Sequence, residues 1–218
     1  MEYFAVNEEI EQKIKHIRRD IMLSMNGICT ENMRNSGFTY RQNFGVALSR
    51  LREIANKHTP NYDLSYRLWL LPIRECKILA TMLCPPDIMD STKLHQWLKN
   101  LDNQELAEVI SMYLFSKAPH LRDEFITLLK SDNFFYRLTA IHTISRIVMT
   151  LDITTLVSAI DNVQGCDMDN ISATRAIESL IFQANEQQSA TIDSSITNLI
   201  TRIKSCGGRY ASQIQTIG

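Results

Sequence analysis

The sequence predicts an all-α protein, a HEAT- or armadillo-like helical-repeat solenoid that is curved, has a concave face and forms a single domain over residues 1–218. Apolar residues recur at three- and four-residue steps almost throughout, and they never alternate at period two for long. Glycine and proline are sparse, 7 and 5 residues of 218, which favours long helices over a turn-rich sheet. Paired helices of about 12–18 residues with short links are typical of helical repeats.

Polar caps and prolines delimit the predicted helices of the N-terminal part. Asn7 is a good N-cap, and apolar residues recur at helical spacing from Ile10 to Met25. The stretch 32–38 breaks this helix, because it contains Gly37. The next predicted helices span residues 46–58, 62–71 and 73–83, with Pro60, Pro72 and Pro85–Pro86 at their ends.

The same rhythm continues through the C-terminal part. Asp90 or Ser91 can cap a helix that runs to Leu101, and Pro119 separates the two helices that follow. The remaining predicted helices span residues 103–118, 120–130, 133–151, 153–163, 170–184 and 189–205. We expect a frayed tail after Gly208.

Charge and cysteine usage limit the possible classes of protein. The net charge of -1 gives no overall sign of a nucleic-acid binder, so any anion-binding surface must be local. Five scattered cysteines without C-x-x-C spacing indicate a reduced, cytoplasmic protein. No run of apolar residues approaches the length of a membrane span, and the five histidines lack metal-ligand spacing. We therefore expect no membrane association, no metal and no cofactor.

A local basic surface lies in the N-terminal third, where basic residues outnumber acidic ones between positions 13 and 57. Arg34 and Arg41 flank Phe38 and Tyr40 in a predicted inter-helix loop. This arrangement suits contacts with phosphate and sugar, which would make Arg34, Tyr40 and Arg41 DNA-binding residues. The alternative is an ordinary solvated face.

Four elements between residues 44 and 80 carry a family resemblance. They are Phe44-Gly45-Val46, the helix segment LREIA at 51–55, Leu68-Trp69, and Glu75 ahead of Leu79-Ala80. In order and spacing these elements resemble the N-terminal half of AlkD-like DNA alkylation repair proteins. The resemblance implies HEAT-like repeats whose concave face holds duplex DNA. It also implies hydrolysis of the N-glycosidic bond of cationic N3- or N7-alkylpurines without a base-sized pocket. We expect a monomer whose partner is alkylated double-stranded DNA.

The resemblance also implies site residues. The family motif W-D-L-V-D aligns with QELAE, which places Glu108 at the catalytic carboxylate and Gln104 at the DNA-contacting aromatic. Their i, i+4 spacing keeps both side chains on one helix face. The arginine that grips phosphate beside the site corresponds to Arg137. A later basic residue, which contacts DNA, corresponds to Arg175, with Ser179 where the family has a tryptophan.

Each of these residues also has a plainer interpretation. Glu108 can be a solvated position on the flank of an amphipathic helix. Arg137 shares an apolar stripe with Ile141, Ile144 and Val148, so it needs an anionic partner. That partner is either DNA phosphate or a structural carboxylate of the next repeat. Three functions stay open: an alkylpurine glycosylase, a non-catalytic HEAT-like module that binds DNA or protein, and a protein-binding scaffold.

Overall fold

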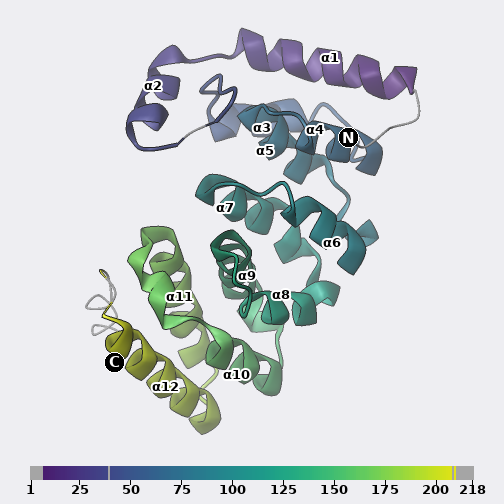
Figure 1. Cartoon of the computed structure of the whole chain (residues 1–218). Helices are drawn as coiled ribbons and strands as arrows, with labels where there is room; N and C mark the ends of the chain where they lie inside the picture. The colour runs from purple at the N-terminus through teal and green to yellow at the C-terminus, as the bar shows by residue number, and fades with distance from the viewer. Residues whose placement is uncertain (1–6, 39, 208, 210–218) are drawn as a thin grey trace. The chain divides into compact units, whose positions relative to one another are not determined.

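The computed structural model describes residues 7–38, 40–207 and 209, and except for Arg209 the predicted tail after Gly208 lies outside these residues (Figure 1). The described residues are helical and contain no β-strand, only an isolated bridge between Gln42 and Ile73, which confirms the all-α prediction. Within the described ranges, no helix is long and apolar enough to cross a membrane. The chain forms two compact units, residues 1–89 and 90–218. A single curved array stays a prediction.

Unit 1 packs short helices around isoleucine and leucine side chains. Its helices are α1 (Glu8–Leu23), α2 (Gly27–Asn35), α3 (Leu48–Ala55), α4 (Tyr62–Trp69) and α5 (Arg74–Leu83), followed by a 3₁₀ turn at Pro86–Ile88. The Asn7 side chain caps α1 by accepting from Ile10 N at 3.2 Å, as predicted. Helix α4 packs against α1 and α5, and α3 also contacts α5. The predicted helices of this unit are present, with shorter bounds.

Helix α2 was not predicted. The sequence analysis expected one helix through Met25, but α1 ends at Leu23 and Asn26 begins a new helix by accepting from Cys29 N at 3.1 Å. None of the residues of α2 is buried, so the helix has no apolar stripe that periodicity could detect. As a consequence, Arg34 lies in the last turn of α2 and not in the loop where we expected it.

Unit 2 contains three successive helix pairs and a final helix. Its helices are α6 (Ser91–Leu98), α7 (Gln104–Tyr113), α8 (Arg122–Leu128), α9 (Phe134–Ile147), α10 (Ile153–Asn162), α11 (Ile171–Asn185) and α12 (Ala190–Cys206). Short 3₁₀ segments span Phe115–Lys117, Pro119–Leu121, Val148–Thr150 and Gly165–Asp169. Helix α9 packs against α7, α8 and α11, while α10 packs against α8 and α12. The second helices of the pairs, α7, α9 and α11, therefore form one layer with α9 in the middle (Figure 1).

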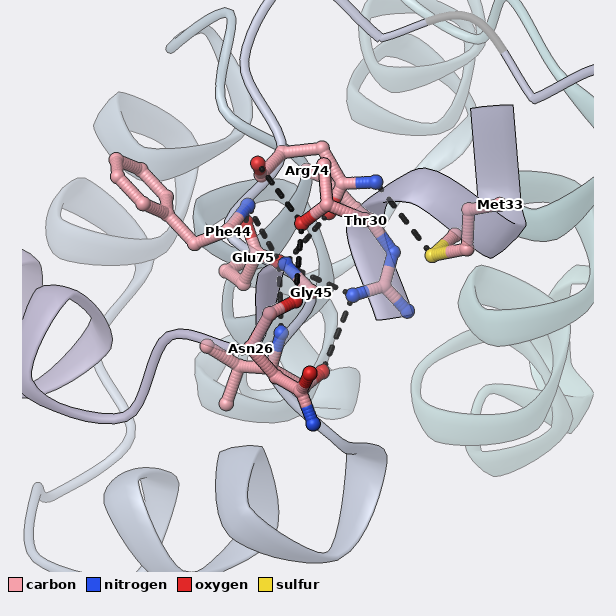
Figure 2. A network of polar contacts seen from close by, with 9 residues as sticks. Asn26, Thr30, Met33, Phe44, Gly45, Arg74 and Glu75 are labelled. Atoms are coloured by element: carbon pink, nitrogen blue, oxygen red, sulfur yellow. Dashed lines mark hydrogen bonds and ion pairs between the residues drawn. The ribbon is translucent and has the colours of Figure 1, made fainter. Parts of the chain in front are cut away.

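A buried carboxylate in unit 1 binds the end of the loop between α2 and α3, just before α3. Glu75 is fully buried and accepts from Phe44 N at 3.2 Å, Val46 N at 3.3 Å and Arg74 Nη1 at 3.1 Å. Arg74 Nη1 also donates to the Val46 carbonyl at 3.1 Å. Figure 2 shows the Glu75 carboxylate beside the backbone of Phe44 and Gly45 and the guanidinium of Arg74. Because a buried charge must be paired, these bonds hold the backbone of Phe44 and Val46 in place.

Gly45 of the Phe-Gly-Val element allows this loop to pass close to α2. Its φ of 68° lies in the left-handed region, and a Cβ atom there would stand 2.2 Å from the Asn26 carbonyl oxygen and 2.7 Å from Thr30 Oγ1. Only glycine satisfies both the conformation and the space.

We predict that Gly45→Ala lowers the free energy of unfolding by about 3 kcal/mol or more, because backbone strain and a steric clash add. Gly37→Ala is the matched control, since Gly37 also has a positive φ, 86°, but open space around its Cα. The control should lose only about 1–2 kcal/mol. Urea unfolding of the full chain measures both, and equal losses for the two variants would contradict the proposed contact.

Candidate functional site

A chain of hydrogen bonds links α9, α11 and α7 across the layer of unit 2. Arg146 Nη1 lies 3.2 Å from His142 Nδ1, and His142 Nε2 lies 2.7 Å from Ser172 Oγ. Ser172 Oγ in turn donates to Glu108 Oε1. Ser172 and His142 are buried, while Glu108 is half-buried. We call these four residues the donor chain, because hydrogen bonds connect them in sequence up to the carboxylate of Glu108, the predicted catalytic group.

The protons of the donor chain can be assigned from its chemistry. Burial and the nearby Arg146 charge lower the pKa of His142 to about 4, so its imidazole is neutral at pH 7. A guanidinium only donates, so Nδ1 of His142 must accept and Nε2 must carry the hydrogen. His142 therefore donates to Ser172, and Ser172 donates to Glu108. Hydrogen bonds aligned in one direction strengthen one another.

This assignment excludes a serine hydrolase. Activation of Ser172 as a nucleophile would need a lone pair on His142 Nε2 to take the hydroxyl proton. Here Nε2 carries the hydrogen, and a cation instead of a carboxylate faces Nδ1. Glu108, and not Ser172, is therefore the residue of the donor chain that can act on a substrate.

Gln104, the second residue of the aligned motif, also binds this carboxylate. Its Nε2 donates to Glu108 Oε1 at 3.1 Å, and its Oε1 accepts from Asn170 Nδ2 at 2.9 Å. Asn170 caps α11 by accepting from Ser172 N at 2.9 Å and Ala173 N at 3.1 Å. Both side-chain donors thus meet at Oε1. Among the described residues none donates a hydrogen bond to Oε2 of Glu108, which leaves this oxygen able to accept from a ligand or water.

A basic depression of about 380 Å³ adjoins the donor chain. Its lining residues, which define the arginine depression, are His142, Ser145, Arg146, Arg175, Ala176, Ser179 and Gln183. Arg146 and Arg175 are exposed, and no acidic side chain lines the depression. In the part of the chain that the structure describes, Arg175 pairs with no carboxylate. Glu108 lies close enough to act on the charge of Arg146, so Arg175 is the guanidinium without an opposing acid, and it favours binding of an anion.

Arg137 lies apart from this cluster. Its Nε and Nη2 bind the buried Asp167 carboxylate at 2.9 and 2.7 Å, and its Nη1 donates to the carbonyl oxygens of Ser131 and Asp132. The hydrogen bonds that Arg137 donates to Asp167 raise the pKa of the guanidinium. Of the two anionic partners that the sequence allowed for Arg137, the structure shows the structural carboxylate. Contact of Arg137 with DNA phosphate stays a prediction. The pair fixes the 3₁₀ segment that precedes Asn170 and α11.

Unit 1 brings its three predicted DNA-binding residues together. Arg34, Tyr40 and Arg41 line a pocket of about 320 Å³. The other lining residues of this loop pocket are Thr30, Phe38, Gln42, Asn43 and Phe44. Arg34 forms an exposed ion pair with Glu31 at 3.0 Å. Arg41 is exposed, and among the described residues it has no acidic partner.

The sequence analysis missed His142, Arg146, Asn170 and Ser172. A signal for two of them was present, because His142 and Arg146 are an i, i+4 polar pair in the otherwise largely apolar α9. Asn170 and Ser172 lie at the N-terminus of α11. Their partners on α7 are more than 60 residues away in the sequence. Local patterns carry no information on such contacts.

Known proteins resemble this chain in sequence family and fold. A family model described as "DNA alkylation repair enzyme" matches residues 26–205. A solved structure described as "a new family of proteins related to the HEAT-like repeat DNA glycosylases with affinity for branched DNA structures" matches with a TM-score of 0.68 and 12% identity. The match covers 87% of this chain and 82% of that one. No curated protein matches. These matches confirm the AlkD-like resemblance and the HEAT-like fold.

We predict that His142 titrates near pH 4, and NMR of its imidazole measures this directly. In the unfolded chain the ordinary value of 6.5 applies, so the unfolded state binds more protons between pH 6.5 and 4. The free energy of unfolding should therefore fall by about 3 kcal/mol as the pH falls through this window. His142→Gln should remove this part of the pH dependence. A midpoint near 6.5 in the folded protein would contradict the proton assignment.

Proposed function

The chain belongs to the DNA alkylation repair enzyme family, and we propose that it binds alkylated double-stranded DNA and excises cationic N3- or N7-alkylpurines. This proposal rests on the hydrogen bonding of the Glu108 carboxylate. One carboxylate oxygen is held by Ser172 and Gln104, the other receives no hydrogen bond from the described residues, and the donor chain leads to the arginine depression.

The chemistry requires little more than this carboxylate. Alkylation at N3 or N7 makes the base cationic, so the base leaves with the electron pair of the C1′–N bond as a neutral alkylpurine. The sugar becomes oxocarbenium-like, and the negative charge of Glu108 stabilises it. Water then forms the new bond to C1′, and its proton passes to Glu108 Oε2 and on to solvent. No step requires a metal or another cofactor.

DNA is bound through its phosphates in this proposal. Arg146 and Arg175 bind phosphate in the arginine depression, which no acidic side chain lines. In unit 1, Arg34, Tyr40 and Arg41 contact the DNA backbone. We assign supporting roles to Gln104, which holds the carboxylate, and to Arg137, which fixes the segment before α11. A monomer in the cytoplasm stays our prediction.

A second candidate function is DNA binding without excision. Gln104 and Ser179 stand where the family motifs have aromatic residues, and Glu108 is one methylene longer than aspartate. The solved structure that matches this chain belongs to a family related to the glycosylases with affinity for branched DNA. In this case Glu108 only joins α7 to α11.

We predict that the wild-type protein releases N3- or N7-methylated purine from methylated duplex DNA and that Glu108→Gln slows release by about 100-fold or more, because the anion is lost. Duplex affinity should change by no more than about twofold, since Glu108 does not bind phosphate. Chromatography of the released bases measures excision. Glu178→Gln removes the same charge from α11 and is the matched control, which should excise normally.

Normal excision by Glu108→Gln would refute the catalytic assignment. If the wild-type protein itself releases no base but binds duplex DNA, the second candidate function is correct.

We also predict that Arg175→Ala weakens duplex binding and reduces the slope of log affinity against log salt by about 1, as expected for one lost phosphate contact. Arg122→Ala, at an exposed arginine of α8, should leave the slope unchanged. Fluorescence anisotropy at several salt concentrations measures both variants. An unchanged slope for Arg175→Ala would place the DNA elsewhere.

A further inference from the structure

The loop pocket of unit 1 offers more than a contact for the DNA backbone, because it is recessed. It is a recess of about 320 Å³, at the small end of the range for small-molecule sites, which is about 300–1,000 Å³. Three aromatic residues, Phe38, Tyr40 and Phe44, line it together with Arg34 and Arg41. A single nucleotide-sized group suits this volume, whereas a DNA duplex can only pass over it.

The charges around the loop pocket favour a phosphate. No aspartate or glutamate lines the pocket. The ion pair of Arg34 with Glu31 is exposed on both sides, and such pairs contribute little, so a phosphate can displace the carboxylate. Arg41 is exposed, and the described part of the chain offers it no acidic partner. Both guanidinium groups are therefore available to an anion.

The aromatic residues indicate what the phosphate is attached to. Every nucleobase has a face that stacks on an aromatic ring, and such stacking tolerates any sequence. In a duplex these faces are covered by neighbouring bases, so rings that line a recess can reach only a base outside the stack. The Gln42 side chain, which makes no hydrogen bond to a described residue, adds an amide that can bind a base edge.

Hydrogen bonds to the rest of unit 1 hold two lining residues of the loop pocket, Gln42 and Phe44, in place. Gln42 N donates to the Pro72 carbonyl at 3.1 Å, and Arg74 N donates to the Gln42 carbonyl at 3.0 Å. Phe44 is held on one side by Glu75 and on the other by Asn26 N, which donates to the Phe44 carbonyl at 2.8 Å (Figure 2). A preformed site loses little conformational entropy on binding.

We propose that the loop pocket binds an unpaired nucleotide of DNA, with its base against the aromatic residues and its phosphate on Arg34 and Arg41. This inference rests on the proposed DNA binding but not on excision. It predicts that the protein prefers DNA with an extrahelical or single-stranded nucleotide over an unbroken duplex.

The test compares the affinity of the full-length chain for a fluorescein-labelled duplex and for the same duplex with one unpaired nucleotide, by anisotropy. We expect the unpaired nucleotide to increase affinity about fivefold or more, as one stacked base provides. Tyr40→Leu should abolish this preference, because it should weaken binding of the duplex with the unpaired nucleotide about fivefold more than binding of the unbroken duplex. Tyr40→Phe, which keeps the ring, should retain it.

The other outcomes separate the two proposals. Binding of both DNAs with equal affinity, or a preference that survives Tyr40→Leu, overturns the unpaired-nucleotide site alone. No binding to either DNA overturns the proposed DNA binding as well. A free nucleotide could occupy the same pocket, and calorimetric titration with deoxythymidine monophosphate tests this alternative ligand. Tight binding of this free nucleotide without any preference among the DNAs would make the pocket a mononucleotide site and refute the proposal.

Discussion

The hydrogen bond from Ser172 to Glu108 joins the first and third helices of the layer in unit 2, and the geometry of the site depends on it. For this bond to form, α11 must begin at the cap residue Asn170, and the Arg137–Asp167 pair fixes the segment just before that cap. Helix α9 must also lie between α7 and α11, which nine buried residues of its fourteen ensure. The packing of three helices thus sets the position of one carboxylate.

Two glutamates of this chain show how environment separates a structural carboxylate from a candidate catalytic one. Glu75 is fully buried, and backbone N–H groups and Arg74 bind both of its oxygens, so its charge serves only to hold the loop. Glu108 is half-buried, and the hydrogen bonds that it accepts from Gln104 and Ser172 fall on the same oxygen. Glu75, whose two oxygens both accept hydrogen bonds, stabilises the fold. Glu108, which has one oxygen without a donor among the described residues, can interact with a reacting sugar.

Local signals predicted most of the helices and part of the site. Asn7 and the prolines marked helix ends correctly, and the i, i+4 spacing placed Gln104 and Glu108 in contact, as their 3.1 Å bond shows. Long-range partners could not be predicted in this way. Arg137 and Arg146 both lie on α9, but only the fold shows that a carboxylate thirty residues away binds Arg137, whereas Arg146 lines a depression without acids. Helix α2 could not be predicted from apolar periodicity, because none of its residues is buried.

We propose that DNA binds unit 2 on the layer formed by α7, α9 and α11. Site-specific photocrosslinking tests it most directly, with a benzophenone side chain introduced at Ser179 in the arginine depression or at the exposed Ile153 of α10. We expect methylated duplex DNA to crosslink to position 179 and not to position 153. Crosslinking from position 153 alone would place the DNA on the other layer and contradict the account.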